Sequence, residues 1–174
     1  MKVFSKKYLI CLAVITLILI FAVFAWNKYE YYLKQNQSYL QQRQVQEFFE
    51  KVNNLNNSFD PAVFSLYSDD ARITSVRIDR KTGKSEKISI NIKDIRPIAK
   101  KLMDMAKQNN DRDCFSNVRY LIEEDRIKIT ADRYSHYKCY DDDSFYMIIK
   151  KDRDNSYRII ETYGTTYVQS SCKN

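Results

Sequence analysis

The sequence predicts an α+β protein in which an N-terminal transmembrane helix precedes an antiparallel sheet packed on three helices. Three observations support this class. Residues 8–26 form an uncharged apolar run, and apolar residues follow helical spacings of three and four from Val45 to Leu55. Beyond residue 72 a period of two dominates, which indicates strands. About 148 residues follow the apolar run, close to the commonest size of one domain.

The apolar run is long enough to cross a bilayer. Its 19 residues match the length that about 30 Å of hydrocarbon requires. Three lysines precede the run (Lys2, Lys6 and Lys7), whereas the charges that follow it are balanced. The positive-inside rule then places the N-terminus in the cytoplasm. We therefore expect a single-pass protein of the bacterial inner membrane, with its domain in the periplasm or otherwise outside the cytoplasm.

A cleaved signal peptide is the alternative interpretation of this run. Val23 and Ala25 satisfy the small-residue rule for a cut after Ala25. The run is longer than the usual apolar core of a signal peptide, and no polar segment separates it from Ala25. Both features favour a retained anchor. Either alternative exports the domain.

The predicted organisation has five parts. They are a cytoplasmic N-terminus (1–7), a transmembrane anchor (8–26), a helical juxtamembrane stalk (27–44), a folded domain (45–168) and a tail (169–174).

Three helices are predicted in the domain. The first follows the apolar stripe of Val45–Leu55 and ends in an asparagine-rich stretch that favours turns. The second covers residues 60–67 and the third residues 94–106. Asp60 and Asp94 are the expected N-caps, because each is followed by a proline in the first turn.

The strands are predicted from alternating apolar residues between turn signals. They are residues 73–78 and 88–92 around a turn at 81–84, a long hairpin of 115–123 and 126–140 about Glu124-Asp125, and residues 144–151 and 157–168. Asp141-Asp142-Asp143 is interpreted as an acidic hairpin turn, because calcium loops alternate their ligands and need a glycine.

Residues 59–71, with the sequence FDPAVFSLYSDDA, resemble the second-helix phrase of the nuclear transport factor two-like (SnoaL-like) superfamily. In that phrase a helix ends in an aromatic residue, a spacer and Asp-Asp-Ala before the first strand. The order of elements from Val45 to Val168 is similar as well. The resemblance implies a curved, cone-like sheet wrapped around a helix.

That superfamily includes isomerases, dehydratases, hydrolases and many binding or assembly modules, so the fold alone assigns no function. Anchored members resemble the inner-membrane scaffold subunits of type IV secretion machines. This sequence lacks their longer cytoplasmic tail and their Asn-Pro-x-Gly turn. The resemblance to those subunits is therefore one of architecture.

Composition excludes several classes of function. Two glycines in the chain, Gly83 and Gly164, cannot build a glycine-rich phosphate loop. The net charge is +7, but without the three lysines before the anchor 26 basic residues face 22 acidic ones in a mixed pattern. We therefore expect no nucleic-acid partner. No spacing of cysteine and histidine fits zinc, and no cofactor is expected.

The catalytic alternative depends on His136 and Asp132. Enzymes of the superfamily use an aspartate or histidine inside the cone as a general base. His136 shares the parity of the polar residues of its strand, including Asp132 and Tyr134, whereas Ile127 and Ile129 take the opposite face. We therefore expect His136 to face water, and we predict that the protein is not an enzyme.

The cysteines of the domain suggest a disulfide. Cys114 and Cys139 fall almost opposite each other across the predicted hairpin, and an oxidising compartment would let them pair. Cys172 is then left free or available for another chain.

Tyrosines are frequent on the predicted strands. Tyrosine combines a large apolar ring with a polar tip, which suits protein interfaces, although strand propensity alone also favours it. The candidate interface residues are Tyr134, Tyr137, Tyr146 and Tyr163.

The leading prediction is a membrane-tethered, exported scaffold or assembly module that binds other membrane or envelope proteins, or a second copy of itself. A secretion system is one setting for such a module. The alternative is a small-molecule binder or isomerase-like enzyme that uses the cone interior. A cavity lined by Asp or His together with Tyr would favour it.

Overall fold

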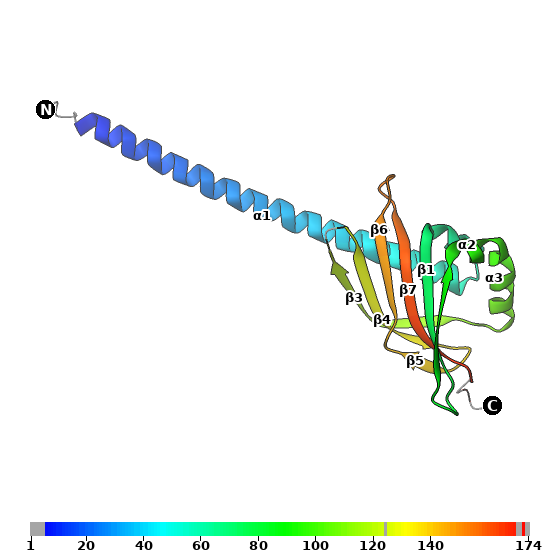
Figure 1. Ribbon diagram of the computed structural model, residues 1–174. Helices are drawn as coiled ribbons and strands as arrows, with labels where there is room; N and C mark the ends of the chain where they lie inside the picture. The colour runs from blue at the N-terminus through cyan, green and yellow to red at the C-terminus, as the bar shows by residue number, and fades with distance from the viewer. Residues whose placement is uncertain (1–5, 124, 170–171, 173–174) are drawn as a thin grey trace. The chain divides into compact units, whose positions relative to one another are not determined.

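The computed structural model describes the backbone of residues 6–123, 125–169 and 172, and the side chains from Leu19 onward within these ranges. The chain divides into two compact units, Met1–Gln44 and Val45–Asn174. Helix α1 covers Lys6–Asn57 and contributes to both units (Figure 1).

In the first unit, residues 27–44 are helical as predicted, and the side chains of 19–40 are exposed. Among the side chains that the structure describes, no helix has the length and apolar character needed to cross a membrane. The described part of the apolar run, 19–26, is shorter than the roughly 20 residues that a span requires. The predicted localisation as a single-pass inner-membrane protein with a periplasmic domain is contradicted by this finding. Residues 8–18 of the predicted anchor lie outside the described side chains.

The second unit contains seven strands and several short helices after α1. In chain order they are η1 (Pro61–Leu66), β1 (Tyr67–Ile78), β2 (Ser85–Asn91), α2 (Ile92–Ile95), η2 (Arg96–Ile98), α3 (Ala99–Gln108), β3 (Asp113–Ile122), β4 (Ile127–Ser135), β5 (Tyr140–Asp142), β6 (Tyr146–Lys151) and β7 (Tyr157–Tyr167).

The strands form one mixed sheet in the order β2-β1-β7-β6-β4-β3, with β5 paired to β4. All neighbours are antiparallel except β1 and β7, which are parallel. The prediction of a purely antiparallel sheet was therefore wrong. Local alternation predicts strands but carries no information about which distant strands become neighbours, and β1 and β7 lie at opposite ends of the domain sequence.

Two predicted helices differ in detail from the structure. Residues 61–66 form a 3₁₀ helix, for which Asp60 is the N-cap as predicted and accepts a hydrogen bond from the Ala62 N–H at 2.8 Å. The next helix begins two residues earlier than its predicted cap, Asp94. Asn91 ends β2 and its side chain accepts from the Lys93 N–H at 2.9 Å, so Asn91 is the cap.

The strands that follow α3 confirm the long hairpin but correct its second half. β4 ends at Ser135, a turn follows, and β5 takes Tyr140–Asp142. Asp141 and Asp142 therefore belong to a strand instead of an acidic turn. Asp142 is buried.

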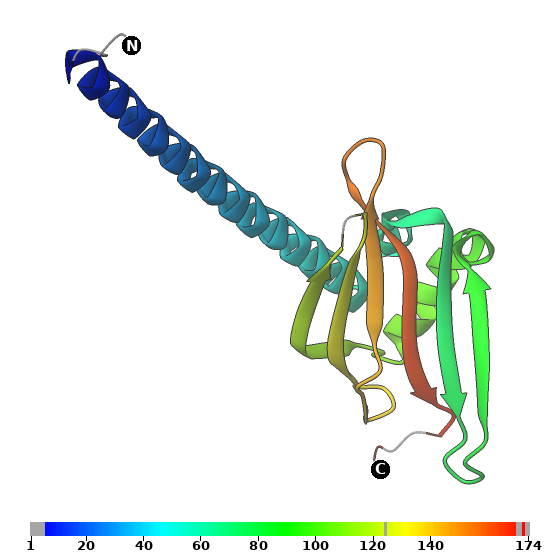
Figure 2. The ribbon, with the colours of Figure 1, turned by 60° about the vertical axis from the view of Figure 1, so that its left-hand side comes forward.

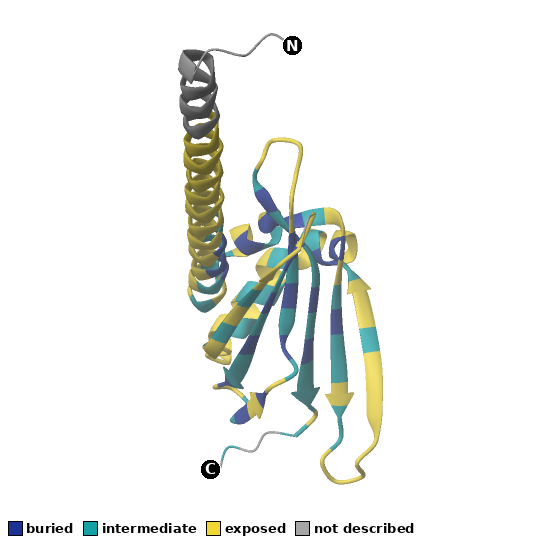
Figure 3. Cartoon of the chain, turned by 90° about the vertical axis from the view of Figure 1, so that its left-hand side faces the viewer, coloured by how far each residue is buried: buried dark blue, intermediate teal, exposed yellow. Residues whose placement is uncertain are grey.

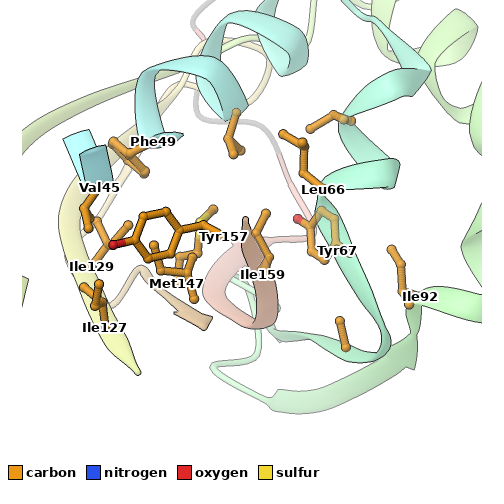
Figure 4. Packing of buried hydrophobic residues seen from close by; sticks show 14 of the residues in the cluster. Val45, Phe49, Leu66, Tyr67, Ile92, Ile127, Ile129, Met147, Tyr157 and Ile159 are labelled. Carbon is orange, nitrogen blue, oxygen red and sulfur yellow. The ribbon is translucent and has the colours of Figure 1, made fainter. Parts of the chain in front are cut away.

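The core lies between the helices and one face of the sheet, and Figure 2 shows α3 behind the strands. Val45, Phe49 and Val52 of α1 are buried, as the helical spacing predicted. Figure 3 shows that buried positions alternate along the central strands, and Figure 4 shows Ile129 and Ile159 in the core with Val45 and Phe49 of α1. Burial of each such side chain contributes about 1.5–3 kcal/mol to folding.

Candidate functional site

The outer face of the sheet, on the side away from the helices of the second unit, carries a group of tyrosines. Tyr146 of β6 pairs in register with Tyr163 of β7, and their rings stack with centroids 5.1 Å apart and planes 6° apart. Lys128 and Tyr134 of β4 lie on the same face, because both alternate with the inward-facing residues of that strand. We call Tyr134, Tyr146, Tyr163, Lys128 and Glu161 the tyrosine face.

Polar contacts hold the tyrosine stack in place. The Lys128 ammonium lies 4.4 Å from the centre of the Tyr146 ring, and the Tyr146 hydroxyl donates to Glu161 at 2.6 Å. Desolvation, together with the neighbouring Glu161 carboxylate, raises the pKa of Tyr146 to about 12. The hydroxyl therefore stays protonated, and it acts here as a hydrogen-bond donor, not as a base.

The remaining candidate residues lie near the end of β4. Tyr137 is in the turn after β4 and is exposed. His136 is exposed as predicted and packs edge-on against Tyr134 at 5.0 Å between ring centres. Asp132 accepts a hydrogen bond from the Asn117 amide at 2.6 Å. Among the described contacts none joins Asp132 to His136, so the structure does not assemble these two into an acid–base pair.

The cysteines pair differently from the prediction. Cys139 forms a disulfide with Cys172, with 5.0 Å between their Cα atoms, and Cys114 is a free, exposed thiol. The register places Cys114 opposite Tyr134, and β4 ends before Cys139 is reached. The Cys114 Sγ instead lies 3.0 Å from His136 Nε2.

The core-facing side of the sheet carries a buried ion pair between Arg133 of β4 and Asp142 of β5. Arg133 Nη2 donates to Asp142 Oδ2 at 3.0 Å, and the Asp142 side chain is 1% exposed. Asp142 also accepts from the main-chain N–H groups of Ser144 and Thr165, at 3.0 and 2.8 Å. Arg133 donates further to the Thr165 carbonyl at 2.6 Å and to the Tyr140 hydroxyl at 3.1 Å.

This network joins β4, β5 and β7 at one end of the sheet. Removal of one partner from a buried pair costs about 3–5 kcal/mol, because the other charge is left uncompensated. Since Asp142 accepts hydrogen bonds at both carboxylate oxygens, its role is to tie these strands together. It has no free acceptor to offer a substrate.

A small cavity of about 280 Å³ lies beside the network. Arg133, Phe145 and Thr162 line it, together with Ser75 and other residues of β1 and β7. Neither Asp132 nor His136 is among the described residues that line it. Its volume is just below that of ordinary ligand pockets, whose volumes begin at about 300 Å³.

Asp113, at the start of β3, is a carboxyl group whose pKa is far above its ordinary value. Burial raises its pKa to about 6, and the Arg133 guanidinium, whose Nη1 lies 3.6 Å from Asp113 Oδ2, opposes this rise. Asp111 and Asp142 add to the rise by repulsion.

The Arg133–Asp142 pair was not predicted from the sequence, although the sequence contains one signal of it. Ile127, Ile129 and Ala131 face the core, so the same parity turns Arg133 inward. A buried guanidinium requires an acidic partner. The run of three aspartates was the place to look for it.

No protein-family model matches the chain, and no curated protein matches it. Solved structures do resemble it. A nuclear transport factor two-like protein with a cystatin-like fold from Novosphingobium aromaticivorans is 13% identical, with a TM-score of 0.50 over 80% of this chain and 90% of that one. Another nuclear transport factor two-like protein, from Cytophaga hutchinsonii, is 11% identical, with a TM-score of 0.50 over 72% of this chain and 98% of that one.

A candidate ketosteroid isomerase from Parabacteroides distasonis is 15% identical, with a TM-score of 0.44 over 68% of this chain and 85% of that one. Similarities at this level concern the fold, and they assign neither an enzymatic nor a non-enzymatic function. The chain therefore has the nuclear transport factor two-like, cystatin-like fold, with a curved mixed sheet and helices on one of its faces.

Proposed function

We propose that the domain is a protein-binding assembly module and that the tyrosine face is its binding surface. The observation that carries this proposal is the ordered stack of Tyr146 and Tyr163 on a sheet face that none of the described helices of the second unit covers. Tyrosine is enriched in protein interfaces, where its ring buries apolar area and its hydroxyl meets polar groups.

The contacts within the tyrosine face support this proposal. Lys128 and Glu161 hold the Tyr146 ring from two sides, so little side-chain entropy remains to be lost on binding. The two charges are of opposite sign, so the rim of the surface can pair with either charge on a partner.

The experiment is photo-crosslinking in cells. Benzoylphenylalanine replaces Tyr163 in the full chain, and the control carries the same residue at the exposed Tyr39 of α1. We expect one discrete adduct from position 163 and none from position 39. Addition of Tyr146→Ala or Lys128→Glu should reduce the adduct at least fivefold, because each removes part of the ordered surface. An adduct of twice the mass of the chain would identify the partner as a second copy.

Failure to form an adduct at position 163 would contradict the proposal. An adduct that neither added substitution weakens would contradict it as well, since contact would then not depend on the tyrosine face.

Binding of a small molecule in the cone interior is the second candidate. The specific observation in its favour is that Arg133, Ser75 and Thr162 line one cavity. Such a lining fits a small carboxylate. Thermal-shift measurements with a panel of short-chain carboxylates test this alternative. A shift that Thr162→Leu abolishes would favour it over the assembly module.

A further inference from the structure

A groove of about 550 Å³ runs between the last turns of α1 and strand β3. Gln46, Glu50, Asn53 and Asn57 line one wall, because residues three or four apart lie on the same side of a helix. Phe49 and Phe115 form the floor, with their rings edge to face and centroids 5.4 Å apart. The groove lies within the second unit and is separate from the tyrosine face.

β3 is an edge strand of the sheet, so one side of its backbone has no neighbouring strand. The side chain of Asn57 occupies one position on that side. Its amide donates to the Asp113 carbonyl at 3.0 Å and accepts from the Asp113 N–H at 3.1 Å. These are the two bonds that an added strand would make to Asp113.

Phe115 presents the next pair of main-chain groups along the same edge. Both main-chain groups of Asp113 face Asn57 and not β4, and the alternation of an antiparallel pair turns the N–H and C=O groups of Phe115, two residues later, the same way. Among the described residues, none hydrogen-bonds the outward N–H or C=O of Phe115. These two groups are therefore available to a ligand at the edge where the groove lies.

The asparagines on the α1 wall of the groove have nearly the same spacing as the outward-facing residues of β3. Asn53 precedes Asn57 by one helical turn, about 6 Å, and Phe115 follows Asp113 by about 7 Å along the strand. Asn57 reaches β3 directly, whereas the groove separates Asn53 from Phe115. An extended chain in this gap would meet main-chain groups on one side and a side-chain amide on the other.

The charge of the groove indicates which side chains a bound peptide would carry. Glu50 and Asp113 line it, and no lysine or arginine is among its lining residues. Arg133 already lies near Asp113, so Glu50 supplies most of the uncompensated charge. A basic side chain on the ligand fits Glu50, and an apolar side chain fits the aromatic floor.

We infer that this groove binds an extended peptide segment of a partner protein, which adds a short strand beside Phe115 and places a basic side chain against Glu50. The segment is short, because the register of β3 shifts between Ser116 and Arg119 and the straight edge ends there.

The test uses the full chain and a blocked hexapeptide of alternating valine and lysine. We expect saturating peptide to slow hydrogen exchange of the Phe115 amide at least tenfold. A copy of the peptide that is N-methylated at alternate residues cannot donate along one edge and should not protect this amide. A valine–glutamate hexapeptide should bind at least tenfold more weakly, because Glu50 repels it.

Two variants locate the site on the protein. Glu50→Gln should weaken the valine–lysine peptide about threefold to tenfold but leave a valine–serine peptide unchanged. Asn53→Ala should weaken both peptides, whereas Asn56→Ala, an exposed position on the same helix, should weaken neither. Absence of Phe115 protection, or equal effects of Asn53→Ala and Asn56→Ala, would overturn the inference. Because the tyrosine face is intact in these variants, such a result would leave the crosslinking test unaffected.

Discussion

Gly164 in β7 leaves room for the buried Arg133–Asp142 ion pair, which packs directly against its Cα atom. A Cβ atom at this position would lie 2.9 Å from Asp142 Oδ2 and 3.4 Å from Arg133 Nη2. Neither neighbour can move away freely, because each makes several other hydrogen bonds. Gly83 suits its turn for another reason: its φ of +68° is a left-handed conformation that other residues adopt with strain.

Gly164→Ala is expected to lower the free energy of unfolding by about 1–3 kcal/mol, the usual cost of excess volume in a packed interior. Urea unfolding followed by circular dichroism measures this loss. Thr166→Ala, two residues along the same strand, is the control and should cost less. Equal stability of Gly164→Ala and the wild type would show that the pair is not packed against β7 as described.

Asp113 makes stability depend on pH. Its pKa is raised from 3.8 to about 6 in the folded protein, so the folded state holds a proton that the unfolded state has released. The contribution of Asp113 to stability is therefore largest below pH 4 and is lost as the pH rises through 6.

Asp113→Asn removes this titration. Relative to the wild type, the variant should gain about 1 kcal/mol between pH 4 and pH 7.5, after allowance for the partial exposure of the carboxyl. Urea unfolding of both proteins across this range gives the difference. Ser116→Ala, which introduces no change in titrating groups, should parallel the wild type. A difference that grows toward acid pH would contradict the sign of the shift.

At the scale of elements, the C-terminal segment is fastened to the turn after β4. The Cys139–Cys172 disulfide closes a loop across a sequence separation of 33 residues. Lys138 adds a hydrogen bond from its ammonium to the Tyr167 carbonyl at 2.7 Å, and Val168 N–H donates to the Ile78 carbonyl at 2.9 Å. The end of β7 is thus held on both sides.

Cys172→Ser is expected to reduce stability by about 3–4 kcal/mol, the chain-entropy value for a loop of this length. Peptide mapping under non-reducing conditions should first recover Cys139 linked to Cys172, with Cys114 alkylated. Cys114→Ser is the matched control and should leave both the linkage and the stability within about 1 kcal/mol. Recovery of a Cys114–Cys139 peptide would contradict the structure and restore the pairing expected from sequence.

Sequence patterns predicted most elements but not their partners. The alternation of Ile88 and Ile90 and the helical spacing from Val45 placed a strand and a helix correctly, because each pattern reflects one local period. The predicted pairing of Cys114 with Cys139 failed because β4 ends at Ser135 and the turn that follows carries Cys139 away from β3, which alternation does not reveal. The pairing of Arg133 with Asp142 depends on a second turn, between β4 and β5, that was taken as continuous strand.

At the scale of the whole molecule, the division into two units predicts separate stability. The core draws its buried residues from Val45 onward, and none of the described residues before Val45 belongs to it. The stalk, 27–44, is helical but contributes no buried side chain.

A fragment of residues 45–174 is therefore expected to unfold in one cooperative transition, with a midpoint within a few degrees of that of the corresponding transition in the full chain. Thermal unfolding followed by near-ultraviolet circular dichroism measures both. A fragment that begins at Asn53 is the control and should be unfolded, because it lacks Val45, Phe49 and Val52. A broad, non-cooperative transition in the longer fragment would show that the first unit is needed for folding.

The parallel pair of β1 and β7 has a consequence for biosynthesis. β7 lies in the middle of the sheet but follows the other six strands of the sheet in the chain, and β1 is synthesised long before it. Until β7 has been synthesised, the β1–β2 hairpin and the β3–β6 strands have no common neighbour to join them. The growing chain thus exposes the edges of β1 and β6 until β7 pairs with both, and open strand edges of this kind are where nascent chains aggregate.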